Sequence, residues 1–227
     1  MTSTVPSFPQ SITALHASKP RKRGTAHYEA TITGRYRSIP VRELALAWYL
    51  YREGHISKMQ LRIWFSAHEM SERRAYGRTQ NPAEKPVFVL EEIQGLLGGR
   101  GSERATRALL GDLKRLAEIG LVTITQNQIT FAKSIDDLSV GEGSGFTSFL
   151  SRLPNLSRRV PVPRRMVRAL AAGFGKAETA YVIAFLTRGL YWSRQSGLYR
   201  VDGRMKLSEM HEVMGVSRSA FSDARHR

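Results

Sequence analysis

Two stretches of this sequence place basic and hydroxyl side chains at helical spacing, and such groups can bind anions. The first stretch is SERATRALLGDLKRLAEIG, residues 102–120, in which Ser102 stands at the position of a helix cap. At 100° per residue, one side of this helix collects Arg104, Arg107, Gly111 and Lys114, and the opposite side collects Leu109, Leu113 and Leu116. We expect the leucine side to pack on a domain and the basic side to contact phosphate groups.

The second stretch is GVSRSAFSDARHR, residues 215–227. Its inward side collects Ala220, Phe221 and Ala224, and its outward side collects Arg218, Ser222 and Arg225 at spacing i, i+4 and i+7. Arginine can form paired hydrogen bonds with a guanine edge, and the hydroxyls of Ser217, Ser219 and Ser222 suit contacts with a nucleic-acid backbone. Both stretches therefore favour a nucleic-acid partner.

The sequence contains no recognisable catalytic arrangement. Its six histidines show no HExxH spacing, and GFGKAET at residues 173–179 lacks the first glycine and the Ser/Thr of a phosphate-binding loop. The absence of cysteine excludes disulfides, cysteine-based zinc sites and thiol nucleophiles. We expect no enzymatic activity, no cofactor and no metal site.

The charge balance points the same way. The 227 residues include 35 Lys and Arg against 19 Asp and Glu, a formal net charge of +16. Such an excess favours a polyanionic partner, a nucleic acid before an anionic membrane. The sequence has no secretory signal and no apolar run long enough to span a bilayer. These features predict a cytoplasmic, nucleoid-associated protein with no membrane partner.

Local signals indicate the elements that position the two stretches. Residues 1–38 predict a flexible basic arm, whose Arg21, Lys22 and Arg23 could lie in a minor groove. Residues 39–133 predict a first domain. There, Pro40 opens a helix over residues 41–52, and Ser57 with Gln60 forms a capping box for the next helix.

The order of elements after Val87 is informative. PVFV predicts a strand, LEEIQGLLGG a short helix, residues 102–120 a longer helix, and LVTITQNQITFAK two strands joined at Gln126, Asn127 and Gln128. This order, with the L..L...GL ending of the longer helix, resembles the winged helix-turn-helix superfamily. The resemblance implies that the longer helix reads DNA and that the hairpin contacts it through Gln126, Asn127 and Gln128.

Residues 134–163 are rich in glycine, proline and arginine and predict a linker. Residues 164–227 predict a second domain with helices over 166–172 and 178–192, a strand or irregular crossing, and the helix pair LSEMHEVMG and SRSAFSDARHR. This pair resembles the helix-turn-helix pattern, with Gly215 in the turn, and departs from it at His211, where alanine is usual. Because no wing follows, we expect this domain to be incomplete at its C-terminus, with the underside of Phe221 uncovered.

The expected fold class is mainly α with small β-hairpins, an α+β tandem winged helix-turn-helix. This tandem arrangement resembles plasmid and phage replication initiators and is equally compatible with bacterial transcription regulators. The resemblance implies sequence-specific binding to double-stranded DNA in a bacterial or mobile-element system.

Two other functions stay open: a protein-interaction scaffold that uses an aromatic surface, and an RNA-binding protein, although RNP-like and GxxG motifs are absent. The aromatic surface would contain Trp48, Tyr49, Tyr51, Trp64 and Phe65. The helices of residues 41–76 either fill the first domain or form a homodimer interface.

Overall fold

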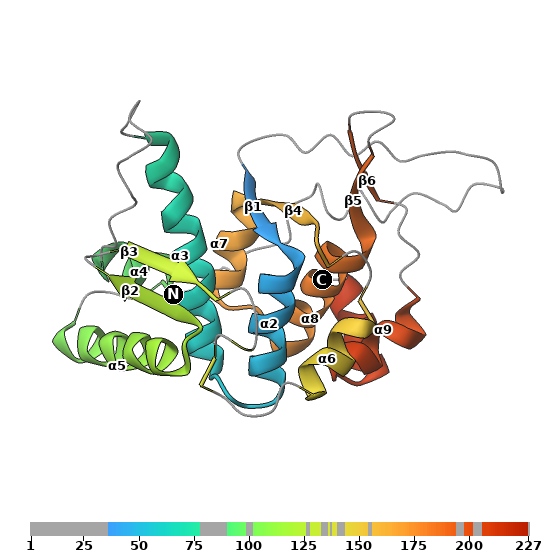
Figure 1. Cartoon of the computed structure of the whole chain (residues 1–227), viewed down its shortest axis with the longest axis horizontal. Helices are drawn as coiled ribbons and strands as arrows, with labels where there is room; N and C mark the ends of the chain where they lie inside the picture. Colours follow the sequence, from blue (N-terminus) through green and yellow to red (C-terminus); the bar gives the residue numbers. More distant parts are fainter. Residues whose placement is uncertain are drawn as a thin grey trace.

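Two strands that lie far apart in the sequence join the two halves of the fold. The computed structural model describes residues 36–77, 90–98, 102–125, 128–132, 136, 138–139, 144–153, 156–193, 198–201 and 206–226. Within them, β1 (Tyr36–Pro40) pairs antiparallel with β4 (Arg159–Pro163), with Ser38 opposite Pro161 (Figure 1). The described part of the chain is mainly helical, with three two-stranded antiparallel sheets.

The first half follows the local signals of the sequence. After β1 it consists of α2 (Val41–Arg52), α3 (Lys58–Gly77), α4 (Leu90–Leu96), α5 (Glu103–Ile119), β2 (Val122–Thr125) and β3 (Gln128–Phe131). The predicted capping box is confirmed, because Ser57 N–H donates to Gln60 Oε1 at 2.9 Å and Gln60 N–H donates to Ser57 Oγ at 3.1 Å. The predicted strand PVFV lies outside the described residues.

The second half contains one helix that is shorter than predicted. Its elements are α6 (Ser144–Ser151), β4, α7 (Arg164–Ala172), α8 (Lys176–Ala184), the π-helical segment η2 (Phe185–Gly189), β5 (Leu190–Ser193), β6 (Leu198–Val201), α9 (Leu207–Met214) and α10 (Arg218–His226). The helix predicted over residues 178–192 is wrong beyond Gly189, because residues 190–193 pair with β6 instead. Aromatic residues such as Tyr191 and Trp192 favour a strand where a partner strand is present.

The two halves share a layout and pack crosswise. Pro40 precedes α2 with φ −60° and ψ 137°, and Pro163 precedes α7 with φ −55° and ψ 136°. Counted from β1 and from β4, the second helix of each half packs against the first helix of the other, α3 on α7 and α8 on α2. The antiparallel β1–β4 pair and this crosswise packing give β1 with α2 and β4 with α7 corresponding places at the junction of the halves.

The linker predicted over residues 134–163 is wrong for α6 and β4. Phe146 and Phe149 of α6 are buried, with ring centroids 5.2 and 5.8 Å from the ring of Tyr49 on α2. Aromatic side chains bury large apolar areas, so α6 is held on α2 rather than free in solvent. Core residues of both predicted domains belong to one hydrophobic cluster.

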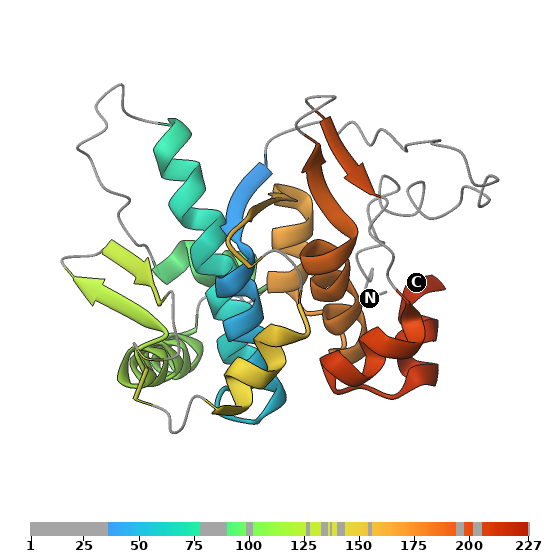
Figure 2. The same cartoon turned by 45° about the vertical axis from the view of Figure 1, so that its right-hand side comes forward.

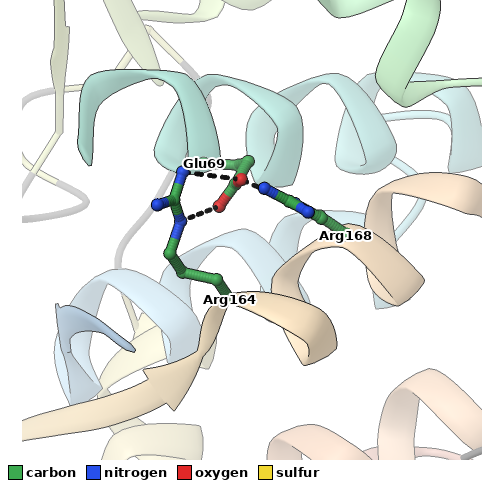
Figure 3. A network of polar contacts seen from close by, with 3 residues as sticks. All are labelled: Glu69, Arg164 and Arg168. Atoms are coloured by element: carbon green, nitrogen blue, oxygen red, sulfur yellow. Dashed lines mark hydrogen bonds and ion pairs between the residues drawn. The ribbon is translucent and has the colours of Figure 1, made fainter. Parts of the chain in front are cut away.

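A buried carboxylate ties α3 to α7 (Figure 3). Glu69 of α3 is fully buried and accepts hydrogen bonds from Arg164 Nε at 3.2 Å, Arg164 Nη2 at 3.1 Å and Arg168 Nε at 2.7 Å. Arg164 and Arg168 stand four residues apart on α7, so both reach the same partner from one helix face.

Two further arginines bind main-chain carbonyls at the ends of helices. Arg62 Nε donates to Ala171 O at 2.7 Å, and its Nη2 donates to Leu97 O at 2.7 Å. Arg52 Nη1 donates to Val213 O of α9 at 2.8 Å. Each guanidinium satisfies C-terminal carbonyls of a helix from the other side of an interface, where the helix dipole favours a cation.

His68 of α3 is fully buried. Its ring stacks on Phe131 with centroids 3.7 Å apart, and its Nε2 lies 3.7 Å from Glu43 Oε2. Burial holds the pKa of His68 well below its ordinary value, and the charges of Arg37 and Arg159 lower this pKa further.

We predict that Glu69→Gln lowers the free energy of unfolding by about 3 kcal/mol, because a buried guanidinium loses its charged partner. In the control, Glu103→Gln removes an exposed carboxylate that lies 2.8 Å from Arg107, and we expect a loss below about 1 kcal/mol. Urea unfolding of both variants measures the difference. Equal losses would show that the Glu69 cluster does not hold the halves together.

We also predict that stability falls as the pH drops below about 6.5, the ordinary pKa of histidine. His68 takes up its proton more readily in the unfolded chain than in the folded one, so acid favours unfolding by up to about 1.4 kcal/mol per pH unit. Urea midpoints between pH 7.5 and 5 should show this slope. His68→Phe should flatten the slope and His55→Gln, at an exposed histidine, should leave it unchanged.

Candidate nucleic-acid interface

The first candidate helix, α5, is divided into an apolar and a cationic side as predicted. Leu109, Leu113 and Leu116 are buried, whereas the exposed residues include Arg104, Arg107, Gly111 and Lys114. Ser102 caps the helix by accepting from Ala105 N–H at 3.2 Å, and Gly120 ends it with φ 87°. The Ser102 hydroxyl therefore has a structural partner within the chain.

Two side-chain hydrogen bonds orient α5 on its neighbours. Gln60 of α3 donates from Nε2 to Asp112 Oδ1 at 2.9 Å, and Gln94 of α4 donates from Nε2 to Thr106 Oγ1 at 2.7 Å. These bonds join opposite flanks of α5 to different helices. They fix which side of α5 faces outward.

The cations of α5 are in contact with acidic side chains of the same helix. Arg107 Nη2 lies 2.8 Å from Glu103 Oε1, and Lys114 Nζ lies 4.0 Å from Glu118 Oε1. The side chains of Arg107 and Lys114 are 74% and 80% exposed. Pairs in water are worth little, so phosphate groups can replace these carboxylates at small cost.

The hairpin predicted after Gly120 is present beside α5. β2 and β3 pair antiparallel with Thr125 opposite Gln128, and Ala132 N–H donates to Leu121 O at 3.1 Å. Gln128 begins β3, whereas Gln126 and Asn127 lie outside the described residues, as do Arg21, Lys22 and Arg23.

The second candidate helix, α10, also has a buried and an exposed side. Phe221 and Ala224 are 0% and 3% exposed, whereas the exposed residues include Ser217, Arg218, Ser219 and Arg225. Ser222 is half-buried. Ala220 N–H donates to Ser217 Oγ at 3.3 Å, so Ser217 caps α10 as Ser102 caps α5.

Phe221 is covered, contrary to the expectation from the sequence. Its ring centroid lies 5.4 Å from that of Tyr181 on α8, at a steep interplanar angle. Burial raises the pKa of Tyr181 to about 12, and the nearby charge of Arg225 acts in the opposite direction. Helix α8 therefore supplies the cover that we expected a wing to provide.

The two candidate helices lie toward opposite ends of the molecule. In both views α5 and the β2–β3 hairpin occupy one end, and α9 with α10 lies toward the other (Figures 1 and 2). The β1–β4 pair and helices α2, α3, α7 and α8 lie between them. A continuous core therefore separates the helices.

Sequence reasoning missed two features of these surfaces. It overlooked Leu110, which is 47% exposed on α5, although a helical wheel places it within 60° of Arg107. It also left out Asp223, an exposed acid among the polar residues of α10.

Four of the five aromatic side chains of the scaffold hypothesis lie in the core, and the fifth, Tyr51, is half-buried and packs against it. Trp48, Trp64 and Phe65 are at most 1% exposed, and Tyr49 is 8% exposed. They cannot form the proposed aromatic docking surface without unfolding.

Compared with protein-family models, curated proteins and solved structures, the chain matches none. Among the described helices, none is both long and apolar enough to traverse a bilayer. The described residues include no group of three or more His, Asp or Glu side chains arranged to hold a metal ion. The assignment of a function therefore depends on the surfaces of α5 and α10.

We predict that Gly111→Ala raises the free energy of unfolding by about 0.5–1 kcal/mol, because a Cβ there meets no atom within 4 Å and alanine is the better helix former. Gly215→Ala should do the opposite, since Gly215 has φ 66° and its Cβ would lie 2.6 Å from Arg52 Cδ. Thermal and urea unfolding measure both. Destabilisation by Gly111→Ala would mean that packing requires this glycine.

Proposed function

We propose that this chain is a sequence-specific double-stranded DNA-binding protein built from two winged helix-turn-helix units, with α5 and α10 as the reading helices. One observation carries the proposal: each helix has a serine cap, a buried apolar side and an outward side with exposed arginines. An α-helix fits the major groove of B-DNA, which is about 12 Å wide.

The proposed DNA contacts are of two kinds: contacts with phosphates, which position the protein, and contacts with base edges, which read the sequence. Lys114 and Arg104 are suited to phosphate contacts, which release counterions and make affinity depend strongly on salt. Arg107 of α5, and Arg218 and Arg225 of α10, are suited to paired hydrogen bonds with the O6 and N7 atoms of guanine. None of these five side chains belongs to the buried clusters that stabilise the fold.

The shared core gives the proposed target a fixed geometry. Because Glu69, the β1–β4 pair and α6 join the halves, α5 and α10 cannot move independently as domains on a flexible linker would. The target is therefore expected to contain two half-sites at one spacing on one face of the duplex.

We propose a plasmid-type replication initiator or a transcriptional regulator as the biological role of this binding. Footprints over repeats beside an AT-rich origin support initiation, and a footprint over a promoter supports regulation. Protection of genomic or plasmid DNA by the full chain separates the two.

We predict that duplexes selected from a random pool contain two conserved half-sites and that binding weakens steeply with salt. Arg107→Ala and Arg218→Ala should each lower the preference for the selected base at one position of the sequence by about 1–3 kcal/mol of binding free energy. Arg42→Ala, at an exposed arginine of α2, is the matched control and should leave the selected sequence unchanged.

The spacing supplies a second readout of the same prediction. Insertion of five base pairs between the half-sites should abolish the affinity gained from the second half-site. The insertion rotates one half-site by about half a helical turn, to the opposite face of the duplex. If Arg107→Ala and Arg218→Ala both select the same sequence as the wild-type chain, the assignment of α5 and α10 as reading helices is overturned.

A further inference from the structure

Leu110 is an apolar side chain on the outward part of a cationic helix. It is 47% exposed, and Met59 at 40% is the other large hydrophobic residue classed as exposed within the described part of the chain. The fold gains little from a leucine that keeps about half of its surface in water.

Leu110 occupies the same helical position as Arg225. Counted from the serine caps, Leu110 is the eighth residue after Ser102 and Arg225 is the eighth residue after Ser217. The seventh residues, Leu109 and Ala224, are both buried, at 5% and 3% exposure. Both helices therefore bury the seventh residue after the cap and expose the eighth.

The equivalence extends along the outward side of each helix. The second, fifth and eighth residues after the cap form one stripe because their spacing of three is close to a helical turn. In α5 this stripe consists of Arg104, Arg107 and Leu110, and in α10 it consists of Ser219, Ser222 and Arg225. Leu110 thus lies one turn from Arg107, which the proposed function places against base edges.

We propose that Leu110 is a specificity-determining residue that selects thymine by contact with its C5-methyl group, an inference that rests on the proposed function. Leucine has no hydrogen-bond donor or acceptor, and in the major groove the thymine methyl is the apolar feature that distinguishes one base from the others. Arg225 at the equivalent position of α10 has paired donors and suits guanine instead.

The neighbours of Leu110 favour a groove over an apolar protein partner. Arg107 and Lys114, one turn away on either side, are exposed cations, and Gly111 has no side chain. One leucine among such residues is too small an apolar patch for a protein interface. Gly111 has no Cβ, and no other atom of the chain lies within 4 Å of the place that a Cβ would occupy. The α5 backbone can therefore approach the floor of a groove closely at this residue.

Replacement of single thymines by deoxyuridine in the selected duplex tests this inference, because deoxyuridine lacks only the methyl group. For the wild-type chain we expect one substitution to weaken binding about three- to five-fold, as for loss of one buried methyl group. Leu110→Ala should weaken binding to the unmodified duplex to a similar degree and should no longer respond to deoxyuridine at that position.

Two further variants sharpen the result. Met59→Ala removes the other exposed apolar side chain, on α3, and should keep both the affinity and the deoxyuridine response of the wild type. Leu110→Arg copies the residue found at the equivalent position of α10, and selection with this variant should replace the responsive thymine by guanine. Thermal unfolding of each variant verifies that the fold is intact.

The outcomes separate the two levels of the argument. Suppose that the wild-type chain binds a selected duplex in a salt-dependent way and that Leu110→Ala keeps the full response to deoxyuridine. This result overturns the role of Leu110 and leaves the proposed function standing. The same holds if no thymine responds in the wild type. Failure of the wild-type chain to bind any duplex overturns both proposals.

Discussion

The buried carboxylate of Glu69 and the two guanidinium groups that hold it fix how the halves of this fold meet. A charge removed from water must find partners of good geometry, because desolvation costs several kcal/mol per ion. Here the three hydrogen bonds come from Arg164 and Arg168 on one helix, while Glu69 belongs to another (Figure 3). Apolar packing alone tolerates small shifts between α3 and α7, whereas a paired guanidinium and carboxylate require one alignment. The relative position of the two halves, and with it that of α5 and α10, depends on this contact together with the β1–β4 pair, α6 and the shared core.

The arginines of this chain serve two different purposes, and the net charge of +16 does not separate them. Arg62 and Arg52 donate to main-chain carbonyls at the ends of helices, and Arg158 donates to a carbonyl within η2. Arg164 is almost covered as it binds Glu69. These cations stabilise the fold and are poorly placed for a polyanion. Arg104, Arg218 and Arg225 are exposed on α5 and α10 instead. The exposed positions of these side chains therefore support the proposed nucleic-acid partner more directly than the total charge does.

Signals that act within one turn of chain were readable from the sequence, and contacts between distant residues were not. Pro40, the Ser57–Gln60 box, Ser102, Gly120 and Gly215 each fix local dihedral angles or satisfy local hydrogen bonds, so the ends of their helices were predicted correctly. The β1–β4 pair was missed because a proline-rich strand resembles a linker until its partner is known. The same reason explains α6, whose phenylalanines become core residues only against Tyr49. In the candidate site, the amphipathic division of α5 and α10 was predictable from the sequence. Leu110 was overlooked, because its role is suggested only by its exposure in the fold and by comparison with Arg225 at the equivalent position of α10.

The likeness of the two halves at their junction does not extend to the surfaces of α5 and α10. Strand, proline and first helix are alike in the two halves, and each second helix packs on the other half. Along the outward stripe, however, α5 has Arg104, Arg107 and Leu110 where α10 has Ser219, Ser222 and Arg225. The two candidate reading helices therefore carry different chemistry at the same distances from their serine caps. If Arg107, Leu110 and Arg225 contact base edges as we propose, a single chain recognises two unlike half-sites and thereby gives its target a direction. A twofold-symmetric dimer of identical reading helices on a palindrome cannot do this.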